Sequence, residues 1–368
     1  MQHRLIIVGG GIVGTLHAWY AVKAGWMVTQ LEADDEPRMG SVRGTGLISV
    51  NTFDRGDLAQ FVAESFQLWR DIGDEIFEFP IRIISSLKVA VSESQNTALL
   101  SHIDLEKYGQ SIVRYRQGDR LLELGPWLGE HVVAGLSCEA DGVVDVAVGL
   151  ALLRTELRKN ANYSYFPNVR ALDIGSGGVM DQYGERYFGD QILLATGTEQ
   201  SLYSADSSAR RLLSTSTAMM IQTRPLQEPL AIAITGLADT DVSIVPQFDG
   251  SIIVGAAIDT TGAHLFAIED ARCKSMMGAA SRILGRPLPH IARRWLTRYV
   301  SSSDNSPGLV RETMPGVVVV TGLGWNGLTT APGLAQQTVR GFGDSHYDFG
   351  FEDEEVVLRE VDEVDLRL

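Results

Sequence analysis

The sequence contains few of the residues that build disulfide frameworks and metal sites. Its 368 residues include only two cysteines, Cys138 and Cys273, and its seven histidines occur singly, without the spacing of zinc ligands. We therefore predict no disulfide framework, no metal site and a reducing, cytoplasmic location. A Gly-x-Ser-x-Gly motif is also lacking, which argues against a hydrolase of that type.

Long apolar runs and excess positive charge are lacking too. Glycines interrupt the apolar segment at 5–28, so no stretch reaches the ~20 residues that a membrane span needs. A net charge of −15 disfavours nucleic acid and anionic membrane surfaces as partners. Residues 352–368 contain eight acidic residues and only two arginines, which predicts a solvated acidic C-terminal tail at 346–368.

Glycine is abundant, and its first cluster lies between two predicted elements. An apolar strand at 4–8 leads into Gly9-Gly10-Gly11-Ile12-Val13-Gly14, after which apolar side chains recur at helical spacing over 12–25. A second predicted strand, 28–32, ends at Glu32. This βαβ unit predicts a parallel sheet.

The cluster satisfies the dinucleotide fingerprint G-x-G-x-x-G in its full context. Gly9 allows a tight turn, Gly11 lets the backbone approach a pyrophosphate, and Gly14 lets helix and strand pack closely. Glu32 is placed to accept a hydrogen bond from a ribose 2′-hydroxyl, and its charge would repel the extra phosphate of NADP. We predict a site for ADP-ribose; a glycine-rich turn without a ligand is the alternative.

Two kinds of layer alternate along the rest of the chain. Helices are predicted at 57–76, 146–159 and 331–340, and buried strands at 191–195 and 317–321. Alternating, strand-like sequence at 81–91 and 215–258 instead predicts an antiparallel sheet. We therefore predict an α/β protein in which a Rossmann-type nucleotide-binding domain is interlaced with an antiparallel-sheet substrate domain. The predicted boundaries are 1–79, 140–213 and 304–345 for the first domain, and 80–139 and 214–303 for the second.

Three later segments accompany the fingerprint: the small residues at 40–48, the strand and turn at 192–197, and the glycine-rich turn and helix at 322–333. In this order, the four segments resemble the D-amino-acid oxidase superfamily of FAD-dependent oxidoreductases, which contains glycine oxidase and sarcosine oxidase. A narrower similarity, to a branch associated with phosphonate metabolism, rests on 41–43, 295–299 and 315–322.

The resemblance implies a D-amino-acid oxidase-like fold that binds FAD. The turn at 322–333 would supply fixed donors for the negative charge that reduced flavin carries. Sarcosine oxidase-like members tether FAD through a cysteine in the C-terminal third, but no cysteine follows Cys273, so we predict non-covalent FAD. Fingerprint and resemblance together assign these FAD-binding residues: Gly9, Gly11, Ile12, Val13, Gly14, Glu32, Ala33, Ser41, Val42, Arg43, Gly46, Leu47, Val169, Ala195, Thr196, Gly197, Gly322, Gly324, Trp325, Asn326, Gly327, Leu328 and Thr329.

The activity that the resemblance implies is oxidation of a carbon–nitrogen bond in a small amine, amino acid or aminophosphonate. A hydride would pass from the carbon beside a neutral amine to flavin N5, the imine would hydrolyse, and oxygen would accept the electrons. The substrate-facing residues predicted are Arg43, Tyr299, Trp325 and Asn326. Arg43 would hold a phosphate, the flavin ring or a substrate anion; a salt bridge to a nearby carboxylate is the alternative.

One position departs from the family pattern. Relatives like glycine oxidase hold the substrate carboxylate with an arginine in the strand after a tryptophan, and alignment on Trp295 puts Tyr299 at that place. Arg298 is adjacent, but neighbouring strand residues point to opposite faces. The substrate therefore lacks a simple α-carboxylate or binds it elsewhere.

Two alternatives remain open. A flavin-dependent monooxygenase shares the first fingerprint, but such enzymes usually carry a Gly-Asp pair near the last glycine turn, where this chain reads Thr321-Gly322-Leu323-Gly324. A non-catalytic flavoprotein that uses its acidic tail as a contact is the other. The sequence does not indicate the oligomeric state.

Overall fold

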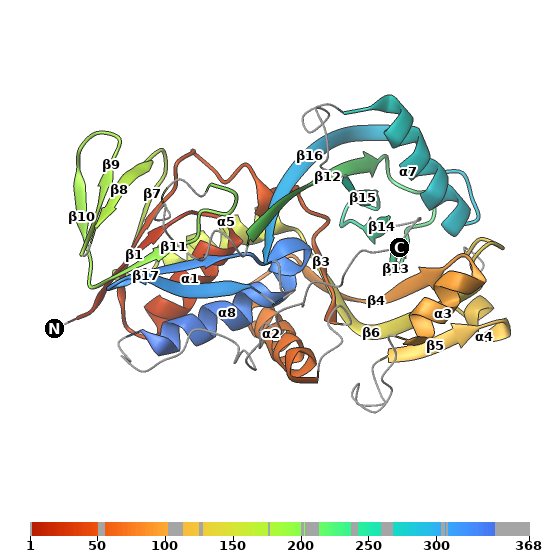
Figure 1. Cartoon of the computed structure of the whole chain (residues 1–368), viewed down its shortest axis with the longest axis horizontal. Helices are drawn as coiled ribbons and strands as arrows, with labels where there is room; N and C mark the ends of the chain where they lie inside the picture. The colour runs from red at the N-terminus through yellow and green to blue at the C-terminus, as the bar shows by residue number, and fades with distance from the viewer. Residues whose placement is uncertain are drawn as a thin grey trace, which may run out of the picture.

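The computed structural model describes residues 2–50, 56–101, 113–124, 128–175, 177–199, 202, 213–236, 242–258, 268–302, 306 and 308–342. The predicted acidic tail lies outside these residues. Two sheet-based layers stand side by side, with the long strands β12 and β16 extending from one toward the other (Figure 1).

The first layer, within the described residues, is a six-stranded sheet in the order β17-β18-β11-β1-β2-β7. Its members are β1 (Arg4–Val8), β2 (Met27–Leu31), β7 (Tyr163–Phe166), β11 (Gln191–Leu194), β17 (Leu309–Met314) and β18 (Val317–Thr321). All neighbours pair in parallel except β17 with β18. Leu5 and Ile7 of β1 face one hydrophobic core, and Ile6 and Val8 face another, because side chains alternate along a strand.

Helices cover one face of this sheet, and a small sheet covers the other. The helices are α1 (Ile12–Lys23), α2 (Gly56–Glu75), α5 (Val146–Leu157) and α8 (Gly327–Gly341), of which α1 packs on α5 and α8, and α8 on α2. The small sheet, which local sequence patterns did not predict, contains β8 (Ala171–Gly175), β9 (Gly178–Asp181) and β10 (Arg186–Phe188). No described helix is long and apolar enough to span a bilayer.

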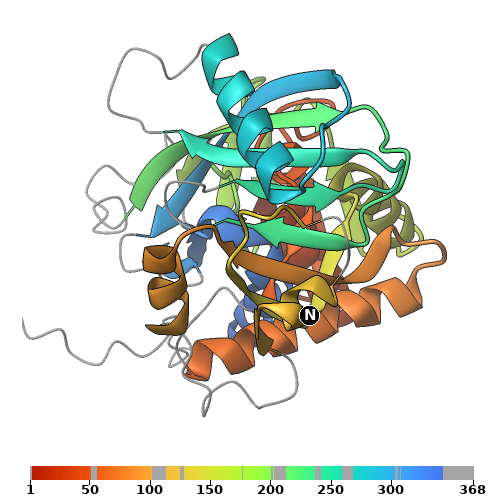
Figure 2. The ribbon, with the colours of Figure 1, turned by 90° about the vertical axis from the view of Figure 1, so that its right-hand side faces the viewer.

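The second layer is a larger sheet in the order β16-β12-β15-β14-β13-β4-β6-β3, with β5 beside β6. Its strands are β3 (Leu47–Ile48), β4 (Ile81–Ala90), β5 (Val113–Gln117), β6 (Ala134–Val144), β12 (Leu213–Thr223), β13 (Ile232–Thr235), β14 (Ser243–Pro246), β15 (Ile252–Ile258) and β16 (Ile291–Ser302). The helices α3 (Glu93–Ser101), α4 (Asp119–Leu122) and α7 (Asp270–Ile283) accompany it. Figure 2 shows α7 lying across this sheet.

The second sheet, predicted to be antiparallel, contains one parallel pair, β4 with β13. These strands are far apart in the sequence and are not joined by a hairpin, so no tight turn imposes an antiparallel direction on them. The other pairs in this sheet are antiparallel.

The two faces of the second sheet differ in what they contact. Met219 and Ile221 of β12 pack with Met276 of α7 in one core. Met220, between them, belongs with Trp295 to a cluster on the opposite face. Strand alternation therefore directs one set of side chains from β12 and β16 away from α7.

The last helix begins earlier than the predicted 331–340, because α8 starts at Gly327 and contains Pro332. Proline lacks an N–H and normally disrupts the helical hydrogen bonds around it. Here α2 supplies partners: Ser65 donates its hydroxyl to the Thr329 carbonyl at 2.6 Å and accepts from the Gly333 N–H at 3.0 Å. Contacts from another helix, absent from local periodicity, explain the longer α8.

Candidate active site

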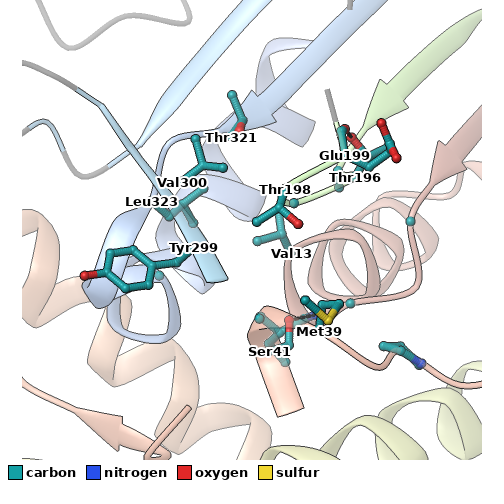
Figure 3. Close-up of a pocket in the computed structure, with 18 of the residues that line it drawn as sticks. Val13, Met39, Ser41, Thr196, Thr198, Glu199, Tyr299, Val300, Thr321 and Leu323 are labelled. Carbon is teal, nitrogen blue, oxygen red and sulfur yellow. Dashed lines mark hydrogen bonds between the residues drawn. The ribbon is translucent and has the colours of Figure 1, made fainter. Parts of the chain in front are cut away.

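A cavity of about 630 Å³ extends from the turn after β1 to β12 and β16, and Figure 3 shows part of its lining. Nineteen of the predicted site residues line it: Gly9, Gly11, Ile12, Val13, Glu32, Ala33, Ser41, Gly46, Leu47, Val169, Ala195, Thr196, Gly197, Tyr299, Gly322, Gly324, Trp325, Gly327 and Leu328. The fold thus brings segments from the whole length of the chain to one cavity.

The three glycines of the fingerprint meet different surroundings. Gly9 has φ +119°, and a Cβ there would lie 2.2 Å from the Ala195 carbonyl oxygen. A Cβ on Gly14 would lie 2.1 Å from the Gly9 carbonyl oxygen. A Cβ on Gly11 would meet only the Ser41 hydroxyl, at 3.0 Å. Packing therefore demands glycine at the first and last of these positions, whereas Gly11 leaves room for a ligand beside the backbone.

Glu32 lies at the end of β2, where it is 9% exposed and lines the cavity. Its carboxylate accepts the Gly10 N–H at 2.7 Å and the Asp34 N–H at 3.0 Å. Each carboxylate oxygen can accept a further hydrogen bond. Burial raises the pKa of the neighbouring Tyr165 phenol to about 12, so that group remains neutral beside Glu32. Glu32 can therefore still accept a ribose hydroxyl.

The segment 40–46 closes over the start of α1. The N-cap of α1, Gly11, has no side chain, and the Ser41 hydroxyl instead accepts the Ile12 N–H at 3.0 Å. Ser41 thus performs the capping role from a distant segment. Gly46 has φ +80°, and a Cβ there would lie 2.4 Å from the Val144 carbonyl oxygen, so this end of the segment is closely packed against β6.

Five predicted site residues do not line the cavity: Gly14, Val42, Arg43, Asn326 and Thr329. Val42 lines a separate cavity of about 250 Å³. Asn326 precedes α8, and its carbonyl accepts the Thr330 hydroxyl at 3.4 Å. The Thr329 hydroxyl is buried and accepts the Ser49 N–H at 3.0 Å. In this structure Asn326 and Thr329 hold local backbone geometry next to the cavity.

Arg43 is bound to backbone carbonyls. Its Nε donates to the Arg38 carbonyl at 2.5 Å and its Nη1 to the Leu296 carbonyl at 3.3 Å, while Trp295 Nε1 donates to the Arg43 carbonyl at 3.0 Å. These bonds join the segment 40–46 to β16. They engage two of the five N–H donors of the guanidinium, and the predicted contact between Arg43 and a substrate anion stays a prediction.

The opposite end of the cavity is formed by the turn between β18 and α8. Gly322 and Gly324 have φ +73° and +61°, conformations that favour glycine, and α8 follows with its free N–H groups. Trp325 in this turn packs edge-on against Tyr299 of β16, with ring centroids 5.6 Å apart. This aromatic pair joins the last turn to the large sheet.

Sequence reasoning missed several lining residues, including Met39, Glu199, Met220, Thr297 and Thr321. Thr297 and Thr321 are 3% and 2% exposed, and neither hydroxyl has a hydrogen-bond partner. A signal for Thr297 was present, because it lies two residues before Tyr299 in a predicted strand and so shares its face. No comparable signal marked Met220 or Glu199.

The residues present fit an extended FAD. One end of the cavity offers an open backbone at Gly11 and the Glu32 carboxylate, and the other offers the unpaired Thr321 hydroxyl and the start of α8. Backbone N–H groups at a helix start bind phosphates and stabilise anionic charge. Such a site on a Rossmann-type sheet defines a nucleotide-dependent oxidoreductase class.

Residues 4–340 match the family model described as DAO, FAD dependent oxidoreductase. The chain belongs to this family, its cofactor is FAD, and it is an FAD-dependent oxidoreductase. The predicted family resemblance, fold class and cofactor are thus confirmed. The narrower resemblance to a phosphonate-associated branch stays a prediction.

Individual relatives are distant in sequence. One subunit of the opine oxidase of Rhizobium meliloti is 24% identical over 332 residues, which cover 82% of this chain and 83% of that protein. The structure of L-proline dehydrogenase from P. horikoshii has a TM-score of 0.82 at 17% identity and covers 93% of both chains. Glycine oxidase from Geobacillus kaustophilus has a TM-score of 0.79 at 18% identity and covers 94% of this chain and 97% of its own.

Proposed function

We propose that this protein oxidises a carbon–nitrogen bond of a small amine, amino acid or aminophosphonate. The observation that carries the proposal is a single cavity that connects Gly11 and Glu32 to the β16 surface at Tyr299. When bound, FAD supplies the hydride acceptor at N5, and the resulting imine hydrolyses in water. The space between the flavin end of the cavity and the large sheet would hold the amine.

In this proposal the chain acts mainly by binding and orienting. Glu32 and the backbone at Gly11 hold the adenosine diphosphate half, and the start of α8 at Gly327 directs N–H groups toward negative charge on the flavin. Tyr299 and Trp325 form an aromatic wall beside the substrate. Positioning of this kind supplies much of the rate enhancement, because hydride transfer needs little besides a neutral amine whose adjacent carbon is held close to flavin N5.

The proposed division of labour follows the predicted domains. Residues 1–79, 140–213 and 304–345 would bind FAD, and residues 80–139 and 214–303 would form the substrate domain. Three relatives support an amino compound as substrate, since their names specify opine, proline and glycine.

An anaerobic screen tests the function. Amines, amino acids, N-substituted amino acids and aminophosphonates are added to the FAD-loaded protein, and the visible flavin band is followed. We expect bleaching by one of these classes without any pyridine nucleotide. Bleaching by NADPH alone would support a monooxygenase instead, and bleaching by no compound would support a non-catalytic flavoprotein.

The electron acceptor needs its own experiment. We propose oxygen, which predicts that the reduced protein is reoxidised in air and forms hydrogen peroxide. The Rhizobium meliloti relative is named as one subunit of its oxidase, which makes a second protein chain the competing acceptor. Reduced protein that remains bleached in air, yet reoxidises with an artificial dye, would reject oxygen.

A further inference from the structure

Thr297 has a buried hydroxyl that forms no hydrogen bond to the protein. The residue is 3% exposed, and its Oγ1 is among the few buried side-chain polar atoms of the described residues that lack a partner. An unpaired hydroxyl in such a place destabilises the ligand-free fold, so its presence calls for an explanation. Thr297 also lines the large cavity, which offers a ligand as the missing partner.

The position of Thr297 within β16 places it on the substrate side of the cavity. It lies opposite Ala218 of β12, and Trp295 opposite Met220. Trp295 and Tyr299, two residues to either side, pack against the cluster that contains Ala218 and Met220, so Thr297 shares their face. The hydroxyl is therefore surrounded by apolar and aromatic side chains.

Arg298 also borders the cavity, but its side chain does not belong to the face of β16 that carries Thr297. Its neighbour Leu296 packs toward α7, and strand alternation sends the Arg298 side chain in the same direction. Among the described side chains that β12 and β16 direct to this face of the cavity, Met220 is apolar and Tyr299 is engaged with Trp325. Of these three residues, Thr297 is the one whose buried hydroxyl has no protein partner.

We propose that the Thr297 hydroxyl is a substrate-recognition group that accepts a hydrogen bond from the amine N–H. The inference rests on the proposed amine-oxidising function and deepens it by naming a substrate class. Accepting the N–H leaves the nitrogen lone pair free, as hydride loss from the adjacent carbon requires. Primary and secondary amines can form this bond, whereas a tertiary amine has no N–H to donate.

Three variants test the proposal. Thr297→Val removes the hydroxyl and keeps the side-chain shape, and Thr297→Ser retains the hydroxyl. Thr223→Val is the matched control on the neighbouring strand, because the Thr223 hydroxyl is buried but paired, with the Arg224 carbonyl at 2.7 Å and the Ile252 N–H at 3.3 Å. Each variant is assayed for thermal unfolding without ligands, for FAD affinity, and for kcat and KM with a secondary amine and its N-methylated tertiary analogue.

We expect Thr297→Val to leave the ligand-free protein as stable as the wild type or more stable, and yet to make it a poorer catalyst. Without ligands, Thr297→Val unfolds at the same temperature as the wild type or a higher one, whereas Thr223→Val unfolds at a lower temperature. FAD affinity of Thr297→Val is unchanged. Its kcat/KM for the secondary amine falls about tenfold, the equivalent of about 1.4 kcal/mol, while the value for the tertiary analogue changes little. Thr297→Ser retains the preference for the secondary amine.

Several outcomes would overturn the inference. A lower unfolding temperature for ligand-free Thr297→Val would mean that the hydroxyl is structural, and a loss confined to FAD affinity would assign it to the cofactor. An unchanged ratio between the two amines would remove its role in recognition while the proposed function stands. If the wild-type protein is reduced by no amine, the proposed function and this inference fail together.

Discussion

The indole N–H of Trp69 donates a hydrogen bond of 2.8 Å to the carbonyl oxygen of Leu328. In a regular helix the residue four positions later would donate to that carbonyl, but here that residue is Pro332. Trp69 is fully buried in α2 and stacks on Phe79. Helix α2 thus completes the first turns of α8, and Leu328 lines the large cavity.

Replacing Trp69 by phenylalanine tests this arrangement. An aromatic ring remains, but the Leu328 carbonyl loses its donor, so we expect the free energy of unfolding to fall by about 1–3 kcal/mol in addition to the packing cost of the smaller ring. Pro332→Ala restores an N–H at the helical position, and in that background Trp69→Phe should cost about 1 kcal/mol less. Urea unfolding of the four proteins measures the difference. Equal costs in both backgrounds would contradict the explanation.

Gly11→Ala and Gly14→Ala should separate FAD binding from folding. The Gly14 methyl would collide with backbone and destabilise the protein by about 1–3 kcal/mol. The Gly11 methyl meets only the end of Ser41, and loss of a glycine N-cap costs about 1 kcal/mol or less. We expect Gly11→Ala to fold and yet bind FAD at least tenfold more weakly, measured by flavin fluorescence titration. Unchanged affinity in Gly11→Ala would show that the backbone there is not approached by the cofactor.

Arg43→Gln should act through structure and not through substrate charge. Its guanidinium donates to the carbonyls of Arg38 and Leu296, so we expect the loss of about 1–2 kcal/mol of stability and weaker retention of FAD. The ratio of KM values for anionic and neutral amines should stay constant. Arg298→Gln, at an exposed position of β16, is the control and should change stability by less than about 0.5 kcal/mol. A collapse of the KM ratio in Arg43→Gln would support the predicted anion contact instead.

His17 should make stability depend on pH. Burial lowers the pKa of its imidazole to about 4, below the ordinary 6.5, and its Nδ1 lies 2.7 Å from the Val13 carbonyl. The folded protein therefore holds the neutral ring, and this contribution is complete above about pH 6.5 and is lost as pH falls toward 4, by up to about 3 kcal/mol. His17→Leu should flatten the difference in unfolding temperature between pH 7 and pH 4.5. Parallel curves for the two proteins would reject the assignment.

FAD should be released by acid. Cys138 is buried in β6, where its thiol donates to Asp141 and burial raises its pKa, and Cys273 is buried in α7 beside Met219. Neither thiol lines the cavity. Precipitation of the loaded protein with acid should leave a colourless pellet and a yellow supernatant. A yellow pellet would show a covalent link through another residue.

The local sequence pattern was sufficient to predict several helices and strands, and also the end of the cavity formed by the glycine turn and Glu32. The strand at 4–8, the helix after Gly11 and the strand that ends near Glu32 appear within a residue or two of their predicted limits. This unit can be predicted from the sequence because its strand, turn and helix follow one another directly along the chain. The three-stranded sheet β8–β10 and the parallel pairing of β4 with β13 were not anticipated, since both depend on partners outside the local pattern.

The sequence by itself determined the dinucleotide turn, because this turn depends on glycines and apolar residues at fixed short spacings. It also carried the family resemblance that implied FAD, through the order of four segments along the chain. Only the tertiary structure decided which side chains reach the cavity. It directed Arg43 to the carbonyls of Arg38 and Leu296, and it left the buried hydroxyl of Thr297, a residue that lines the cavity, without a partner. The physical reason is that hydrogen-bond partners and strand neighbours come from segments far apart in the sequence, and chain folding alone brings them together.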